Sequence, residues 1–188
     1  AWRHGQLPGL AAVIAFLDET GFLLQPLNRR TWAPRGQTPI QYASAKHDRL
    51  SVIGAVTLSP QRQRISTYWQ FYDGNIVAPD VVAFLRSLHR QQSRKLIVVL
   101  DRFSVHRKAI RLLKESGVKW LSVEWLPGYA PDLNPVEAMW SCTKYGDLAN
   151  YTPDDLWDLG EEVGNSFVRQ YQDPDIKRSY FQTAQLKL

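Results

Sequence analysis

The sequence has almost no cysteine and no long apolar run. Cys142 is the one cysteine among 188 residues, so an intramolecular disulfide is impossible and a cysteine-based zinc site is not expected. No apolar stretch approaches the roughly 20 residues that cross a bilayer, and no signal peptide is recognisable. We therefore expect no membrane partner, and the scarcity of cysteine is consistent with the cytoplasm.

The rest of the composition is typical of one globular domain. Hydrophobic residues make up 44% and aromatic residues 12% of the chain, which excludes a largely disordered protein. A chain of this length buries enough apolar surface to fold without a disulfide or a structural metal. We predict a single domain over residues 1–188, with a core at about 11–150 and a helical tail at about 153–188.

Positive charge is concentrated in the middle of the chain. The net charge is +5, from 23 Lys and Arg against 18 Asp and Glu. Ten of these cations lie between Arg86 and Lys119, whereas residues 147–162 contain six acids and no Lys or Arg. A basic middle favours binding of nucleic acid or another polyanion, and a solvated basic helix face explains it equally well.

The hydrophobic pattern predicts alternating strands and helices. We expect a turn at Thr20–Gly21 and an irregular excursion over residues 26–48, because Pro and Gly interrupt both. Strands are predicted at 11–17, 22–25, 50–58, 64–72, 95–100 and 119–125, and helices at 79–91, 105–115, from Pro135 and from about Pro153. This order indicates an α/β fold with parallel strands covered on both faces.

Two apolar strands each end in an aspartate, Asp18 and Asp101. If these strands are neighbours in the sheet, their two carboxylates converge at its edge. Carboxylates held close together repel each other, and a divalent cation such as Mg²⁺ is the usual reason for tolerating them. The alternative is that each aspartate only caps a turn or the next helix, and the sequence leaves both interpretations open.

A third acid is needed to complete a two-metal site. The candidates are Glu124, Asp132, Glu137 and Asp147. Glu137 has the most informative context, because Asn134 is a good N-cap and Pro135 a good first helical residue. Glu137 then lies in the first helical turn, where its direction is fixed. It either ligates a metal or closes a capping box onto Asn134, and the two roles are compatible.

Four sequence blocks carry a resemblance to a known family. They are residues 16–22 (FLDETGF), 30–39 (RTWAPRGQTP), 98–107 (VVLDRFSVHR) and 126–137 (LPGYAPDLNPVE), the last followed by Trp140. With these blocks the chain resembles the catalytic domain of DDE transposases, specifically bacterial insertion-sequence enzymes of the IS six-thirty group that are related to mariner elements. The resemblance implies a ribonuclease-H-like fold, a mixed five-stranded sheet flanked by helices.

The resemblance also implies a reaction and a site. Asp18, Asp101 and Glu137 would form the catalytic triad and bind two Mg²⁺ or Mn²⁺ ions. The activity would be metal-dependent DNA strand cleavage at the element ends, followed by strand transfer into target DNA in cut-and-paste transposition. The implied partners are DNA and a second copy in a synaptic homodimer, in the bacterial cytoplasm and on the nucleoid when bound to DNA.

The second and third blocks, with the helix that follows the third, supply candidate DNA-binding residues. These are Arg35 in the second block, Arg102 and His106 in the third, and the helix cations Arg107, Lys108 and Arg111. For His106, a phosphate contact, a role in supporting the carboxylate site and a merely structural role are all open. The second block is expected to form a loop or hairpin near DNA or a partner subunit, with Trp32 packed in the interior.

Two departures from the family pattern support an alternative function. Arg102 stands where the family usually has Asn, and only about a dozen residues precede the first strand, so the family's N-terminal helix-turn-helix domain is expected to be absent from this chain. The alternative is a catalytically inactive descendant that acts as a DNA- or protein-binding module. A repair nuclease of the same fold is a third hypothesis, against which the second and fourth blocks argue.

Overall fold

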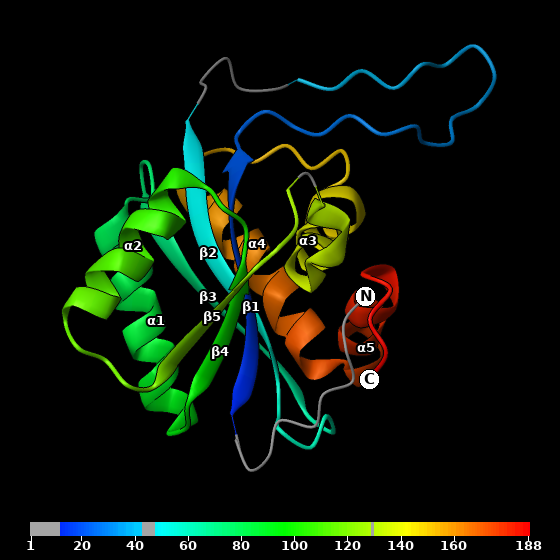
Figure 1. Cartoon of the computed structure of the whole chain (residues 1–188). Helices are drawn as coiled ribbons and strands as arrows, with labels where there is room; N and C mark the ends of the chain where they lie inside the picture. Colours follow the sequence, from blue (N-terminus) through cyan, green and yellow to red (C-terminus); the bar gives the residue numbers. More distant parts are fainter. Residues whose placement is uncertain (1–11, 43–47, 129) are drawn as a thin grey trace.

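A five-stranded mixed sheet forms the centre of the protein (Figure 1). The computed structural model describes residues 12–42, 48–128 and 130–188. The strands lie in the order β3-β2-β1-β4-β5. Their bounds are β1 Val13–Leu23, β2 Arg49–Leu58, β3 Ile65–Asp73, β4 Leu96–Leu100 and β5 Leu121–Trp125. The predicted mixed five-stranded sheet is confirmed.

The central strand β1 has partners of opposite direction. It pairs antiparallel with β2 and parallel with β4, while β2 pairs antiparallel with β3 and β4 parallel with β5. In the parallel pair, Val13 lies beside Leu96 and Phe16 beside Val99. The strands that carry Asp18 and precede Asp101 are therefore neighbours, which meets the condition under which their carboxylates converge.

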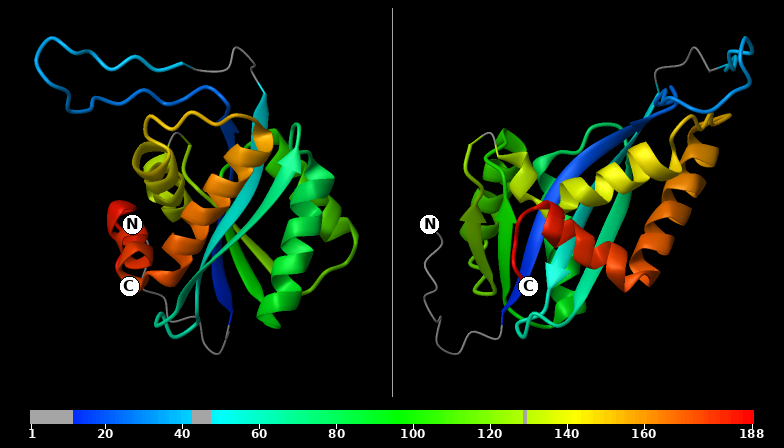
Figure 2. Two further views of the ribbon diagram at one scale, coloured as in Figure 1. Left: turned by 180° about the vertical axis from the view of Figure 1, so that it is seen from behind. Right: turned by 90° about the vertical axis from the view of Figure 1, so that its right-hand side faces the viewer.

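Helices cover both faces of the sheet (Figure 2). The helices on one face are α1 Ala78–Gln92 and α2 Ser104–Glu115. Those on the other face are α3 Pro135–Ser141, the π-helical turn η2 Cys142–Asp147, α4 Leu156–Gln172 and α5 Pro174–Thr183, and a short 3₁₀ turn, η1 Pro131–Leu133, precedes α3. No helix of the described residues is long and apolar enough to span a membrane.

Alternation along β1 divides its side chains between two cores. Ala15 and Leu17 belong to the apolar core under α1 and α2, whereas Phe16 and Phe22 belong to the core under α3, α4 and α5. The C-terminal helices are integral to this second core. The ring of Phe181 from α5 packs edge-on against Phe16, with ring centroids 5.7 Å apart.

Strand β1 is longer than its sequence pattern indicates. No turn forms at Thr20–Gly21, because these residues pair with Val52 and Ser51 of the long strand β2. Asp18 therefore lies within a strand and not at its end. Gly21 also leaves room for Arg49, whose Cδ would lie 2.5 Å from a Cβ placed there. Residue 11, the first of the predicted strand, lies outside the described residues.

The C-terminal tail contains two helices where the sequence suggested one. Helix α4 begins at Leu156, and Asp173 caps the start of α5 by accepting hydrogen bonds from the backbone N–H groups of Asp175 and Ile176. Pro174 follows as the first residue of α5, where its missing N–H costs nothing. The Asp173–Pro174 pair thus ends α4 and begins α5.

Between β1 and β2 the chain forms an exposed projection, here called the arm (residues 27–42), which extends away from the body (Figures 1 and 2). At its turn the Gln37 N–H donates to the Pro34 carbonyl at 3.0 Å, and Gly36 supplies the required positive φ of 83°. The irregular excursion is confirmed, except for residues 43–47, which lie outside the described part. The expectation that Trp32 is packed is wrong, because the arm has no core and Trp32 is 100% exposed.

Candidate active site

Asp18 points from β1 toward α3. Its neighbours Leu17 and Glu19 face the opposite side of the sheet, because side chains of a strand alternate. The indole Nε1 of Trp140 donates to Asp18 Oδ2 at 2.9 Å. Burial, together with the charges of Glu137 and Glu19, raises the pKa of Asp18 to about 7 despite this hydrogen bond. Burial and the neighbouring carboxylates therefore both disfavour the ionised form of Asp18.

Gly54 makes this arrangement possible. It lies opposite Asp18 on β2, and a Cβ at this position would lie 2.3 Å from Cη2 of Trp140. Any side chain here would push the indole away from the sheet and from Asp18. The sequence analysis missed Gly54, although a lone glycine inside the apolar strand LSVIGAVTL is a recognised signal of close approach.

Glu137 is directed by the cap of its helix. Asn134 accepts a hydrogen bond from the Val136 N–H at 3.2 Å and donates its own side-chain amide to the Leu17 carbonyl at 3.2 Å. The predicted N-cap is confirmed, and it ties the start of α3 to the residue before Asp18. No capping box forms, because the backbone N–H of Asn134 is bonded to the Pro131 carbonyl.

The Glu137 carboxyl interacts with the other two acids. Burial raises its pKa, the charge of Lys144 lowers it, and the charges of Asp132 and Asp101 raise it further. A hydrogen bond with Asp18 lowers the pKa of Glu137. The Glu137 carboxyl thus lies within electrostatic reach of both Asp18 and Asp101.

Lys144 is a cation at the site that the sequence analysis missed. Its Nζ donates to Thr20 Oγ1 and lies 5.4 Å from the centre of the Phe22 ring. Burial lowers its pKa, whereas the charges of Glu137 and Asp18 raise it. A signal was present, since Lys144 follows Glu137 by seven residues and two helical turns place such residues on one face.

Asp101 follows β4 and is held by the start of α2. Its Oδ1 accepts hydrogen bonds from the Phe103 N–H at 2.9 Å and from His106 Nδ1 at 2.6 Å. The other ring nitrogen of His106, Nε2, lies 2.5 Å from Glu19 Oε2. Burial lowers the pKa of His106, but the hydrogen bonds and charges of Glu19 and Asp101 outweigh it and raise the pKa to about 9.

The predicted DNA-binding residues divide into exposed cations and one buried group. Arg107, Lys108 and Arg111 are exposed on α2, where Arg111 lies 3.8 Å from Glu115. Arg102 is exposed beside Asp101, and Arg35 lies in the turn of the arm. His106 does not belong with them, because it is only 1% exposed and both its ring nitrogens face carboxylates. Direct contact between His106 and a phosphate is therefore incompatible with this structure.

The arm is anchored to the loop that follows η2. Asn150 accepts a hydrogen bond from the Arg29 N–H at 2.7 Å, and its carbonyl accepts one from the Gln41 side chain at 2.5 Å. The Gln41 amide also contacts Thr152 Oγ1 at 2.6 Å. The Arg29 guanidinium lies 5.3 Å from the centre of the Tyr145 ring. Both sides of the arm are thus fixed close to the helix that carries Lys144.

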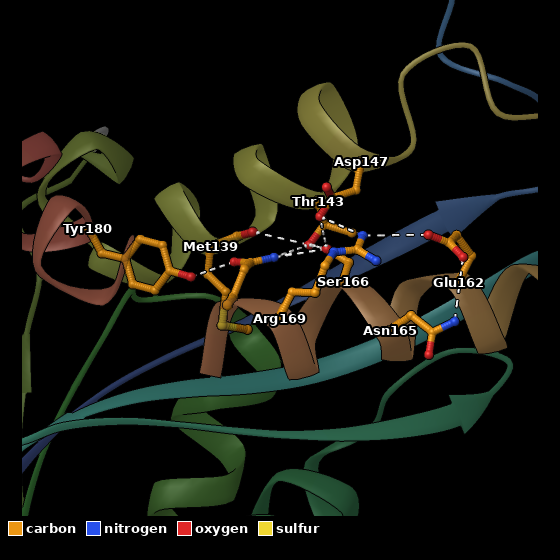
Figure 3. Close-up of polar contacts among 9 residues, drawn as sticks. Met139, Thr143, Asp147, Glu162, Asn165, Ser166, Arg169 and Tyr180 are labelled. Atoms are coloured by element: carbon orange, nitrogen blue, oxygen red, sulfur yellow. Dashed lines mark hydrogen bonds and ion pairs between the residues drawn. The ribbon is translucent and has the colours of Figure 1, made fainter. Parts of the chain in front are cut away.

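A buried polar network fixes η2 against α4 and α5 (Figure 3). Thr143 and Ser166 share a hydrogen bond of 2.9 Å, and Gln170 donates to Thr143 at 2.7 Å. Ser166 donates to Asp147 at 2.5 Å, and the Tyr180 hydroxyl donates to Gln170. Buried hydrogen bonds of this kind specify one packing arrangement. They hold the helical segment that carries Lys144.

The carboxylates have the chemistry that a divalent cation requires. Among the described residues, no three Asp, Glu, His or Cys side chains lie close enough together to hold one ion. The donors are nevertheless hard oxygen atoms, and Asp18 and Glu137 are partly buried and act on each other's pKa. One oxygen of Glu19, Oε1, is also buried without a partner in the described part. Crowded carboxylates fit Mg²⁺ or Mn²⁺.

Solved structures share this fold. The Mos1 mariner paired-end complex with Mn matches with a TM-score of 0.64 and 18% identity, over 92% of this chain and 52% of the other. A Mos1 transposase paired-end complex with left transposon end gives 0.63 and 17%, over 91% and 52%. The Mos1 strand transfer complex gives 0.59 and 18%, over 92% and 51%. The ribonuclease-H-like fold is thereby confirmed, and this chain spans about half the length of the Mos1 chains.

Sequence comparison identifies the family. No curated protein matches the chain. The family described as DDE superfamily endonuclease matches residues 13–158, a range that includes Asp18, Asp101 and Glu137. The match covers most of the chain and all five strands of the sheet. The chain therefore belongs to the DDE superfamily endonuclease family.

Proposed function

We propose that this chain is the catalytic domain of a cut-and-paste transposase, which cleaves DNA strands at element ends and joins them to target DNA. The observation that carries the proposal is the coupling of carboxyl groups from three separate segments: Glu137 from α3 interacts with both Asp18 from β1 and Asp101 after β4. Parallel pairing of β1 with β4 and the Asn134 cap bring these segments together. Phosphodiester chemistry is the reaction that such a cluster serves when it binds metal.

Asp18, Asp101 and Glu137 would hold two Mg²⁺ or Mn²⁺ ions. When bound, such ions activate the attacking oxygen and stabilise the leaving oxygen at a phosphodiester. The chain's own groups orient the ligands: Trp140 holds one oxygen of Asp18, and the Phe103 N–H holds one oxygen of Asp101. Lys144 adds a positive charge beside Asp18 and Glu137.

DNA is the proposed partner. The exposed cations of α2 are Arg107, Lys108 and Arg111, which begin six residues after Asp101. A DNA backbone that reaches the carboxylates would therefore also pass α2. Arg102 and Arg35 are further proposed phosphate contacts. We propose that the arm, with Trp32 fully exposed, faces DNA or a second copy in a synaptic dimer, since the similar Mos1 structures are paired-end complexes.

The wider assignment follows from the same resemblance. We propose that the chain comes from a bacterial insertion-sequence enzyme of the IS six-thirty group, acting in the cytoplasm and on the nucleoid. We propose one catalytic domain over residues 1–188, with recognition of element ends by a helix-turn-helix domain outside this chain. No observation favours the catalytically inactive descendant: Arg102 is exposed, and all three acids are retained.

A nicking assay tests the proposal. The protein is incubated with supercoiled plasmid and Mn²⁺, with EDTA and the Asp101→Asn variant as controls. We expect relaxed plasmid only with the wild type and metal, and circular dichroism should show that the variant is folded. Equal nicking by Asp101→Asn, or none by the wild type on either plasmid or an oligonucleotide with a pre-cut end, would overturn the assignment.

A further inference from the structure

We propose that Glu19 and His106 form a positioning relay that fixes the orientation of the Asp101 carboxylate for metal binding. The inference deepens the proposed function and rests on it, since it concerns how one ligand is held. His106 does not contact the metal or DNA in this scheme. It acts through Asp101, and Glu19 acts through His106.

The relay begins with the geometry of β1. Asp18 and Glu19 are consecutive residues of one strand, so their side chains leave opposite faces of the sheet. Asp18 faces α3, where Trp140 holds it. Glu19 faces α2, where His106 receives it. Through His106, Glu19 on one face of the sheet is connected to Asp101, which directly follows the end of β4.

The hydrogen bonds of His106 define its role. Nδ1 lies 2.6 Å from Asp101 Oδ1, and Nε2 lies 2.5 Å from Glu19 Oε2. Both contacts have hydrogen-bond length, so the two carboxylates hold the buried ring from opposite sides. Glu19 therefore fixes the plane of the imidazole, and the imidazole in turn fixes the Asp101 carboxylate.

The relay leaves one oxygen of Asp101 for a ligand. Oδ1 already accepts from His106 and from the Phe103 N–H, which fixes the plane of the carboxylate. The Asp101 side chain is 56% exposed, so water would otherwise allow it to rotate. His106 is 1% exposed and packs edge-on against Phe103, with ring centroids 6.1 Å apart. The buried His106 ring thus orients the exposed Asp101 carboxylate.

A purely structural role for His106 makes a different prediction. In that case the ring only joins α2 to β1, and its loss lowers stability without changing metal affinity. In the relay, loss of His106 frees Asp101 and leaves Glu19 as an unpaired carboxylate beside Asp18. Metal affinity then falls, because groups that orient ligands typically contribute about 10–100-fold to binding.

The test is Mn²⁺ binding by the full chain, measured through the electron paramagnetic resonance signal of the free ion. We expect His106→Ala to weaken Mn²⁺ binding by about 10–100-fold. His106→Asn should bind more tightly than His106→Ala, because its amide N–H replaces the Nδ1 donor to Asp101. Glu19→Gln should also weaken binding, because an amide holds His106 Nε2 less firmly than a carboxylate does. His89→Ala is the matched control, because His89 stacks on Trp120 and bonds the Arg94 carbonyl.

The outcomes separate the relay from the proposed function. If wild-type protein binds no Mn²⁺, the proposed metal-dependent function fails. If wild type binds, and folded His106→Ala and Glu19→Gln both bind with wild-type affinity, the relay is overturned while the function stands. The unfolding midpoint in EDTA identifies a variant that has only lost stability. If His106→Ala does not fold, Glu19→Gln decides the question, and wild-type affinity in that variant overturns the relay.

Discussion

The two helical layers of this protein stabilise the sheet in different ways. The layer of α1 and α2 covers an apolar core, and among the described residues the one buried polar side chain that these two helices contribute is His106. The helices of the other layer bury Thr143, Ser166 and Gln170, with Asn134 at the start of α3. The first layer presents cations to solvent, whereas the second directs Glu137 and Lys144 toward Asp18.

The difference indicates where function constrains the fold. Apolar contacts are non-directional, so the α1–α2 layer contributes stability without fixing single side chains. Hydrogen bonds are directional, and the other layer uses them to fix the segments that carry the site residues. His106 is the exception in the apolar layer, and it too is bonded to the site. We expect substitutions in the two layers to affect stability and activity differently.

The largest loss of stability is expected from the apolar layer. Leu113 of α2 is fully buried, and Leu113→Ala should lower the free energy of unfolding by about 2–5 kcal/mol, through lost burial and the cavity left behind. Urea denaturation measures this change. Nicking activity per folded molecule should be unchanged well below the transition. Leu112→Ala, on the exposed side of the same helix, is the control, and an equal loss there would contradict the prediction.

Gly54→Ala should affect both stability and activity. The added Cβ collides with Trp140, so the free energy of unfolding should fall by about 1–3 kcal/mol. Trp140 should also leave Asp18, and nicking should be lost. Gly164→Ala is the control: a Cβ there meets no atom of the described structure within 4 Å outside its own helix backbone, so it should stabilise α4 by about 0.5–1 kcal/mol. Retained nicking by Gly54→Ala would refute the proposed role of Trp140.

A smaller loss is expected from the polar network. Ser166→Ala leaves Thr143, Asp147 and Gln170 without a shared partner, which should cost about 1–2 kcal/mol of unfolding free energy. Nicking should fall as well, because η2 and Lys144 are less firmly held. Asn165→Ala, one residue away and exposed, should change stability by less than about 0.5 kcal/mol. If Ser166→Ala changes the unfolding free energy no more than Asn165→Ala does, the network does not stabilise the packing of η2.

The smallest effect on stability, but a clear one on DNA binding, is expected on the outside of α2. The triple change Arg107→Gln, Lys108→Gln and Arg111→Gln should leave the unfolding free energy within about 0.5 kcal/mol. The slope of log affinity against log salt should become shallower by about 0.9 for each phosphate that the helix no longer neutralises. Arg178→Gln on α5, which pairs with Asp175, is the control. An unchanged slope in the triple variant would place the DNA path elsewhere.

Short-range patterns in the sequence predicted most of the fold. Alternating and continuous apolar runs located the strands, and the Asn134-Pro135 pair predicted the start of α3. The length of β1 was not predictable, because the local turn signal at Thr20–Gly21 was overridden by ten consecutive pairings with β2. The exposure of Trp32 was missed for a related reason, since an aromatic side chain alone does not reveal whether a core lies beside it.

By itself, the sequence determined most of the order of elements and the family blocks, because these depend on residues close together in the chain. Only the tertiary structure decided that Glu19 meets His106, that Trp140 lies over Gly54 to reach Asp18, and that Lys144 lies within electrostatic reach of Glu137. Each of these contacts depends on strand register and helix packing, which bring together side chains from distant segments. Electrostatic coupling acts over a few ångströms in space, and no one-dimensional pattern records that distance.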